Sequence, residues 1–285
     1  MATIPFDQLE DQPYSEDLYN VRTSLEPVSL LSEYGPALRE QYDELGVISF
    51  ANVLSPTEIE SICDAFRSLV VRTDLPSDVQ LQFENAAKGL VDDMPAEERL
   101  NYLRKFMIFA HCDERIQAIM NRPDLIAIIS EMLGGEPEMF QDMALLKPAG
   151  IGREKPWHQD HAYFNLPEGT PVVGLWIALD EAVPENGCMH FLLGGHKAGP
   201  IAHFNRRDWQ ICDSEVLERN AAVAAPLPAG GALIFDGLTP HGTPSNRSDR
   251  RRWALQFHYV KKGTPRISTE ARFAIFGEDR HNSSC

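Results

Sequence analysis

The sequence has no apolar stretch long enough to span a bilayer. Its first residues have neither the apolar core of a secretory signal nor the arginine-rich pattern of a transit peptide. The last residues, H-N-S-S-C, match neither a peroxisomal signal nor a prenylation box. We therefore expect no membrane association and a cytoplasmic location.

Cysteine is scarce as well. The five cysteines are scattered and lack C-x-x-C spacing, so the sequence predicts neither a disulfide framework nor a zinc ribbon and indicates a reducing compartment.

Positive charge is in deficit, with 26 Lys and Arg against 42 Asp and Glu and a formal net charge of −16. This balance argues against binding to nucleic acid or to an anionic membrane. We interpret the basic run between Arg247 and Lys262 as a local feature. The expected partner is a small-molecule substrate, bound by a monomer or homodimer.

The composition is typical of a globular chain, with 43% hydrophobic and 24% charged residues. Residues 1–35 mix Pro, Asp, Glu and Ser without a clear period, so we expect an N-terminal arm that is at most partly ordered. Residues 36–285 are expected to form a single domain.

The first half of the chain reads as mainly helical. A helical pattern from Glu33 precedes an apolar strand at 46–50, and the capping box Ser-Pro-Thr-Glu at Ser55 begins a second helix. Residues 113–134 are predicted to form one further helix, closed by Gly134-Gly135.

The second half reads as strands, because short apolar or alternating runs are separated by Gly and Pro. These runs lie at 139–147, 172–180, 188–193, 222–226, 232–236 and 252–260. Helices followed by strands predict an α+β chain with a double-sheet jelly-roll core that N-terminal helices buttress.

The segment Trp157-His158-Gln159-Asp160-His161 carries the sharpest chemical signal. In an extended segment, residues two apart share a face, so His158 and Asp160 can reach one metal ion while Gln159 points away. With a second imidazole they would form the 2-His-1-carboxylate triad of iron(II) oxygenases. An isolated H-x-D is a weak motif and also fits a solvated polar pair.

His241 is the candidate for the second imidazole. It follows the apolar run 232–236 in a Pro-His-Gly turn, where the backbone is fixed and the ring can face a cavity. The alternative is a structural turn histidine. His190, His196 and His203 lie between the two motifs, and each is more simply read as a structural residue.

A third signal is Arg252, eleven residues after His241, at the start of the run 252–260. Alternation puts Arg252, Ala254, Gln256 and His258 on one face, and Trp253, Leu255, Phe257 and Tyr259 on the other. A guanidinium can bind the distal carboxylate of a 2-oxo acid in bidentate fashion. Alone, Arg252 would read as a surface residue, but together the three signals fit one chemistry.

The chain resembles the phytanoyl-CoA dioxygenase-like family of iron and 2-oxoglutarate enzymes, from about residue 40 to residue 262. The resemblance rests on W-H-Q-D-H-A-Y-F, on G-L-W-I-A-L-D-E-A-V-P-E-N-G-C-M-H-F-L-L-G-G-H-K-A-G, on P-H-G-T-P-S-N and on Arg252. It implies a double-stranded β-helix of cupin type. One departure is Leu193-Gly194-Gly195-His196-Lys197, where many relatives carry P-G-S-H-K.

The resemblance also implies roles for nine residues. His158, Asp160 and His241 would bind Fe(II), and Arg252 would anchor the carboxylate of 2-oxoglutarate with help from Thr243. Further contacts to the co-substrate would come from Trp176, Lys105, Gln141 and Met143. Trp176 also fits core packing, and Lys105 also fits a solvated helix charge.

The expected reaction is oxidation of a substrate C–H bond, with hydroxylation favoured, in which 2-oxoglutarate and O2 yield succinate and CO2. Asp160 occupies the position that is a small residue in related halogenases, which disfavours halogenation. His161, Tyr163, Phe164 and Gln256 are candidates to line the substrate cavity.

Two other classes of protein fit part of this pattern. A cupin-type binding or sensor protein would keep the fold and the metal without oxidation. A zinc hydrolase would need a general base beside the metal and has no use for Arg252.

Overall fold

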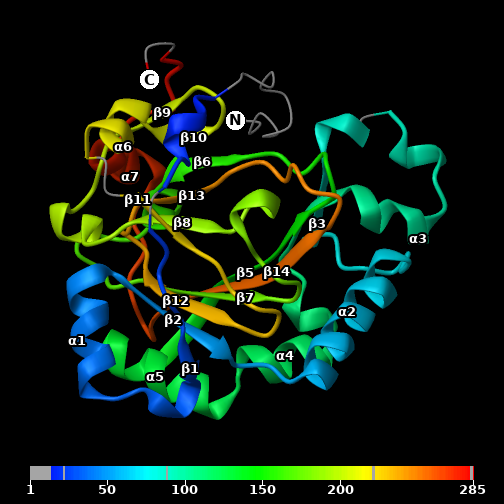
Figure 1. The fold of residues 1–285 in the computed structure, drawn as a ribbon, viewed down its shortest axis with the longest axis horizontal. Coiled ribbons are helices and arrows are strands. Elements are labelled where there is room, and N and C mark those ends of the chain that lie inside the picture. Colours follow the sequence, from blue (N-terminus) through cyan, green and yellow to red (C-terminus); the bar gives the residue numbers. More distant parts are fainter. Residues whose placement is uncertain (1–13, 22, 88, 220–221, 283–284) are drawn as a thin grey trace.

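Two β-sheets face each other in the centre of the molecule, and helices cover the outer face of the larger sheet (Figure 1). The computed structural model describes residues 14–21, 23–87, 89–219, 222–282 and 285. The first thirteen residues of the expected arm lie outside these ranges.

Within the described residues, the larger sheet has eight strands and the smaller sheet has four. In spatial order the larger sheet consists of β1 (Val28–Leu30), β2 (Val47–Asn52), β12 (Ala232–Asp236), β7 (Val173–Ala178), β14 (Arg252–Lys261), β5 (Pro137–Lys147), β4 (Leu103–Met107) and β3 (Gln80–Phe83). The smaller sheet consists of β11 (Ala222–Ala225), β8 (Met189–Leu192), β13 (His241–Thr243) and β6 (Lys155–His158), and a separate pair consists of β9 (His203–Asn205) and β10 (Trp209–Ile211).

The α-helices are α1 (Pro36–Leu45), α2 (Pro56–Val70), α3 (Ala96–Arg99), α4 (Glu114–Met120), α5 (Pro123–Leu133), α6 (Asp213–Arg219) and α7 (Thr269–Phe276). Short 3-10 turns are η2 (Glu16–Leu18), η3 (Leu31–Glu33), η4 (Asn85–Ala87), η5 (Val91–Asp93), η6 (Leu100–Tyr102), η7 (Ala110–Cys112), η8 (Asp160–Tyr163), η9 (Pro184–Asn186) and η10 (Gly195–Ala198). The prediction of an α+β jelly roll with helical buttresses is confirmed.

The predicted capping box starts α2. Ser55 Oγ accepts a hydrogen bond from the Glu58 amide, and the Glu58 carboxylate accepts one from the Ser55 amide at 2.7 Å. Each bond satisfies a donor that the first helical turn leaves without a partner.

The helix predicted over 113–134 is wrong in one respect, because α4 ends at Met120 and α5 begins at Pro123. Pro123 has no N–H for a helical bond and disfavours helical geometry at Arg122, so the chain turns there. The predicted end is confirmed, since Gly134 adopts a left-handed φ of 63°.

The first half is also less helical than expected, because β3 and β4 extend the larger sheet. All six predicted strand segments contain a strand, and β6 covers the start of the extended segment predicted at the H-x-D motif, but β9, β10 and β13 were missed. Each of these missed strands has only three residues, too few to establish a period.

Two cores hold the layers together. Residues such as Phe66, Ile129 and Leu255 pack between the helices and the larger sheet. Trp176 and Phe235, with their neighbours, pack between the two sheets. The predicted alternation along β14 is confirmed, since its odd-numbered residues 253–259 enter the helix-side core, whereas the even-numbered ones face the smaller sheet.

The described part of the N-terminal arm packs against the body of the molecule. Strand β1 pairs in parallel with β2, and Leu18 is buried, with its carbonyl accepting a hydrogen bond from Trp157 Nε1 at 3.2 Å. The domain boundary near residue 35 stays a prediction.

The expectation that the cysteines form no disulfide framework is wrong for one pair, because Cys212 and Cys285 form a disulfide across 73 residues of sequence. Such a pairing depends on the C-terminal segment returning to the start of α6, which cysteine spacing does not reveal. The argument for a reducing compartment therefore loses its basis. Over the described ranges, every helix is too short or too polar to traverse a lipid bilayer.

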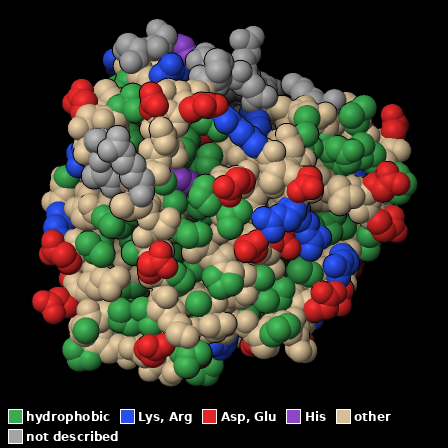
Figure 2. Space-filling view, in the orientation of Figure 1, with side chains coloured by type: hydrophobic (Ala, Val, Ile, Leu, Met, Phe, Trp, Pro, Cys, Tyr) green, Lys and Arg blue, Asp and Glu red, His purple; other side chains and the backbone are tan. Residues whose placement is uncertain are grey.

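Four cations of the basic run near the end of the chain have acidic partners. Arg247 pairs with Glu16, Arg250 with Glu181, Arg251 with Asp180 and Lys262 with Glu136. On the face drawn in Figure 2, basic side chains are likewise interspersed with acidic ones.

Candidate active site

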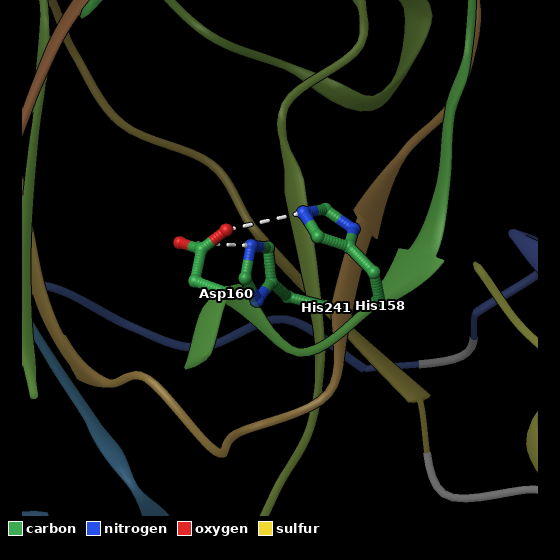
Figure 3. Close-up of side chains that lie close together, drawn as sticks. All are labelled: His158, Asp160 and His241. Carbon is green, nitrogen blue, oxygen red and sulfur yellow. Dashed lines mark ion pairs between the residues drawn. The ribbon is translucent and has the colours of Figure 1, made fainter. Parts of the chain in front are cut away.

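Three predicted metal ligands converge at one end of the smaller sheet (Figure 3). Strands β6 and β13 are neighbours, and their register puts His158 opposite His241. Asp160 begins η8 directly after β6. The ligand atoms of the three residues lie within 4.8 Å of one another, and all three residues are buried. His158 Nε2 is 3.2 Å from Asp160 Oδ1, and His241 Nε2 is 3.6 Å from Asp160 Oδ2.

Backbone carbonyls orient both imidazoles. His158 Nδ1 lies 2.7 Å from the Pro156 carbonyl oxygen, and His241 Nδ1 lies 3.0 Å from that of Thr239. A carbonyl oxygen only accepts, so the proton is on Nδ1 and the Nε2 lone pair faces the centre. Burial also lowers the pKa of His158 to about 4, which favours the neutral ring that a metal requires.

The carboxylate of Asp160 is held by β14. Asp160 Oδ2 lies 2.7 Å from His258 Nε2 and accepts a hydrogen bond from Gln256 Nε2 at 3.0 Å. Burial alone would raise the pKa of Asp160, but the rings of His241 and His258 outweigh it and hold this pKa well below its ordinary value. The ligand set is therefore two neutral nitrogens and one anionic oxygen.

Gln159 fixes the backbone between the two ligands of the H-x-D motif. Its side-chain amide donates to the carbonyls of Gly199 and Leu238 at 2.9 and 2.7 Å, and its oxygen accepts from the Ile201 amide at 2.8 Å. The extended segment thus directs Gln159 away from its neighbours, as expected.

Arg252 and Lys147 form a buried cationic pair on adjacent strands. The β14–β5 register puts the two residues opposite each other. Arg252 donates from Nη1 to the Leu145 carbonyl at 3.3 Å, and its Nε has no hydrogen-bond partner in the described part of the chain. Burial lowers the pKa of Arg252 to about 10, which leaves it charged at neutral pH. Lys147 Nζ donates to the Pro244 carbonyl at 2.6 Å. The described ion pairs include no carboxylate partner for either residue. An anion bound between the strands would therefore stabilise these two buried cations.

All nine predicted site residues line one cavity between the sheets. These residues are Lys105, Gln141, Met143, His158, Asp160, Trp176, His241, Thr243 and Arg252. The indole ring of Trp176 lies 5.3 Å from the Arg252 guanidinium carbon, and its buried Nε1 has no hydrogen-bond partner among the described residues. Lys105 lies on strand β4, not on a helix, and burial together with the charges of Lys155 and Arg104 lowers its pKa to about 7.

Three of the four candidate substrate residues also line this cavity, namely Tyr163, Phe164 and Gln256. The prediction for His161 is wrong, because its ring packs near Phe276 of α7, with centroids 5.4 Å apart. The sharp turn of η8 directs His161 away from the face that Asp160 shares with His158.

The other histidines between the motifs have structural surroundings, as predicted. The backbone amide of Gln159 donates to His203 Nε2 at 3.1 Å, and His203 Nδ1 lies 2.8 Å from the Ile201 carbonyl oxygen. His190 Nδ1 lies 3.1 Å from the Cys188 carbonyl oxygen, and His196 Nε2 lies 3.2 Å from that of Asp43.

The sequence did not reveal the contacts of His258 and Gln256 with Asp160, nor the positions of Lys147 and Arg104 in the cavity wall. For His258 and Gln256, the polar face of β14 was the available signal. It indicates that these side chains serve a polar site, but not which group they contact.

Comparisons with known proteins agree with this geometry. The family model described as phytanoyl-CoA dioxygenase (PhyH) matches residues 42–254. Phytanoyl-CoA dioxygenase domain-containing protein 1 of Danio rerio is 25% identical over 261 residues, which cover 78% of this chain and 88% of that protein.

Solved structures share the fold. EvdO2 from Micromonospora carbonacea var. aurantiaca is 26% identical, with a TM-score of 0.63, and the match covers 85% of this chain and 96% of EvdO2. The epimerase SnoN, solved in complex with Fe3+, alpha ketoglutarate and nogalamycin RO, has a TM-score of 0.64 at 18% identity, with 82% of this chain and 86% of SnoN covered.

The family match spans both ligand motifs and Arg252, and the resemblance found in the sequence is confirmed. The chain belongs to the phytanoyl-CoA dioxygenase family and is a 2-oxoglutarate-dependent non-haem iron oxygenase.

Proposed function

We propose that this enzyme hydroxylates a C–H bond of a small organic molecule. The reaction consumes one O2 and one 2-oxoglutarate, and one oxygen atom enters the product while the other enters succinate as CO2 is released. The observation that carries the proposal is the convergence of His158, Asp160 and His241 in the cavity that also holds Arg252.

The donor set fits a ferrous ion. His158 and His241 would each supply an imidazole nitrogen and Asp160 a carboxylate oxygen, which is the 2-His-1-carboxylate donor set of iron(II) oxygenases. Iron with 2-oxoglutarate and O2 would supply the oxidising power that C–H cleavage requires. The chain holds the ligands in fixed orientations through the carbonyls of Pro156 and Thr239.

Arg252 is the proposed anchor for the distal carboxylate of 2-oxoglutarate. Its buried Nε lacks a partner among the described residues, and an anion there would satisfy both the hydrogen bond and the charge. Thr243 and Trp176 contribute an O–H and an N–H to the same cavity, and Lys105, Gln141 and Met143 contribute its remaining proposed contacts.

Phe164 and Tyr163 border the cavity on the metal side. The Tyr163 ring lies edge-on to the His158 ring, with centroids 5.6 Å apart, and Phe164 packs against His258 at 4.9 Å. Their role would be to position the substrate and to exclude water from the metal.

The test is a screen for compounds that stimulate succinate release from 2-oxoglutarate by the anaerobically reconstituted enzyme. Hydroxylation predicts that labelled O2 adds one labelled oxygen atom to the product and one to succinate. A product without label would instead indicate desaturation or ring closure. Asp160→Ala is the matched control and should release no succinate.

A binding or sensor protein without oxidation is the competing function. It predicts metal and 2-oxoglutarate binding with no compound-dependent O2 uptake. That outcome across the screen would contradict the proposed hydroxylation.

A further inference from the structure

The cavity wall is strongly cationic in a chain that is acidic overall. Its lining includes six cationic side chains but only the carboxylates of Glu84 and Asp160, whereas the whole chain has a net charge of −16. The six cations are Arg104, Lys105, Lys147, Arg153, Lys155 and Arg252. Positive charge concentrated in this way destabilises the folded protein unless anions compensate it.

The co-substrate does not account for this charge. On the proposed function, the charges of a ferrous ion, Asp160, the 2-oxoglutarate dianion and Arg252 cancel. Five cations then remain in the lining against one carboxylate, Glu84. Asp208, which lies in the β9–β10 loop, pairs with Lys155 at 2.6 Å and also lies near Lys105 and Arg104, but it adds only one negative charge.

The lysines can relieve their repulsion by losing protons. Burial and neighbouring cations lower the pKa of Lys105 to about 7, and burial and Arg252 hold the pKa of Lys147 well below its ordinary value. Arginine side chains in proteins keep their charge, so Arg104 and Arg153 cannot reduce the repulsion by losing a proton.

Arg104 and Arg153 both lie near the carboxylate of Glu84, at long range. Glu84 Oε2 lies 3.9 Å from Arg104 Nη1 and 3.4 Å from Arg153 Nε, and neither contact is a hydrogen bond. Arg104 Nη2 donates to the Glu154 carbonyl at 3.3 Å, but its buried Nη1 has no hydrogen-bond partner in the described ranges. A guanidinium with a buried, unused donor is a site for an anion.

This site is separate from the one at Arg252. Arg104 lies on β4, and strand β5 separates β4 from β14 in the larger sheet. Strands are spaced by about 4.8 Å, so the two backbones are roughly 10 Å apart across the sheet. With the distal carboxylate of 2-oxoglutarate assigned to Arg252, the unused donor on Arg104 Nη1 is left for a second anionic group.

We propose that the primary substrate is an organic anion and that Arg104, with Arg153 beside it, binds its carboxylate or phosphate. The inference rests on the proposed function, because it assigns Arg252 to 2-oxoglutarate. The anionic group would lie toward β3 and β4, and the rest of the molecule would extend along the cavity to the metal ligands.

The test measures binding of a second anion to anaerobic protein loaded with Fe(II) and saturated with 2-oxoglutarate. Acetate and inorganic phosphate are the probes, and acetamide is the uncharged match of acetate. The expected result is that at least one anion binds with one site per chain and at least tenfold more tightly than acetamide. Preference between acetate and phosphate identifies the kind of group that the substrate carries.

Arg104→Gln should weaken anion binding by roughly 10- to 100-fold, the range for a charge-assisted hydrogen bond of about 1.5–3 kcal/mol. Arg104→Lys keeps the charge and should retain part of the preference. Arg72→Gln is the matched control, because Arg72 is an exposed arginine that pairs with Asp74 outside the cavity.

Unchanged affinity for 2-oxoglutarate in these variants shows that the cavity is intact. If the loaded enzyme binds 2-oxoglutarate but binds no anion in preference to acetamide, or if Arg104→Gln keeps the full preference, this inference is overturned and the proposed function stands. If Fe(II) and 2-oxoglutarate do not bind at all, the proposed function fails first and this inference fails with it.

Discussion

His258 Nε2 lies 2.7 Å from Asp160 Oδ2, although the two residues are 98 positions apart in the sequence. Gln256, two residues before His258 on β14, donates to the same oxygen at 3.0 Å. Asp160 Oδ1, which is 3.2 Å from His158 Nε2, is therefore the oxygen left for the metal. One strand thus carries both the proposed co-substrate anchor and the two groups that orient the carboxylate ligand.

The first prediction concerns this orientation. His258→Leu should weaken Fe(II) binding by roughly 10- to 100-fold, the usual effect of losing a partner of a metal ligand. Metal titration of the anaerobic protein measures it. The control is His111→Leu, at an exposed histidine that does not line the cavity. Equal iron affinity in wild type and His258→Leu would show that Asp160 needs no such support.

Arg252→Leu tests the co-substrate anchor. We expect a loss of about 1.5–3 kcal/mol in 2-oxoglutarate binding, because the distal carboxylate loses a charge-assisted hydrogen bond. Calorimetry on the Fe(II) form measures this loss. Arg251→Leu is the control, since Arg251 pairs with Asp180 at the surface. A 2-oxoglutarate affinity that Arg252→Leu leaves unaltered would remove Arg252 from the site.

Gly174 couples packing between the sheets to the metal site. A Cβ at Gly174 would lie 2.5 Å from the Phe235 ring, and that ring packs edge-on to His241 with centroids 5.0 Å apart. We expect Gly174→Ala to lower the free energy of unfolding by about 1–3 kcal/mol, the usual cost of overpacking. Iron affinity should fall with it.

Chemical denaturation and metal titration check both effects of Gly174→Ala. Gly35→Ala is the comparison, because a Cβ at Gly35 meets nothing within 4 Å. If Gly174→Ala has wild-type stability, the Phe235 ring can shift to make room for the added methyl group. That result would contradict tight packing of Phe235 between the sheets.

Acid should destabilise the metal-free protein through its buried histidines. Burial lowers the pKa of His203 to about 3, whereas an unfolded histidine has a pKa of about 6.5. The unfolded chain therefore binds more protons below about pH 6.5, so the contribution of His203 to stability is present above that pH and is lost as pH falls toward 3.

The expected observation is a melting temperature that falls with pH across this interval, and less steeply in His203→Gln. Gln keeps a donor and an acceptor but does not titrate in this range. If the melting temperatures of wild type and His203→Gln fall equally steeply with pH, groups other than His203 cause the acid sensitivity.

Local signals in the sequence predicted much of this structure. The capping box at Ser55, the alternation along β14 and the spacing of His158 and Asp160 each depend on residues close together in the chain. The family resemblance supplied Lys105 and Trp176, which local patterns read equally well as surface and core residues.

What the sequence did not reveal depends on contacts between distant segments. The short strands β6 and β13 are defined by pairing with each other, and the contact of His258 with Asp160 forms only when β14 lies against the smaller sheet. The Cys212–Cys285 disulfide and the arginines around Glu84 are of the same kind. No periodic pattern or motif in the sequence marks any of these contacts.

The most direct test of the account measures iron and 2-oxoglutarate binding together in anaerobic wild-type and His241→Ala protein. We predict one Fe(II) per wild-type chain and 2-oxoglutarate binding that strengthens when Fe(II) is present. His241→Ala should lose the iron and, with it, that increase in affinity. Iron retained by His241→Ala, or a 2-oxoglutarate affinity that ignores Fe(II), would contradict the assignment of His158, Asp160 and His241 as the metal centre.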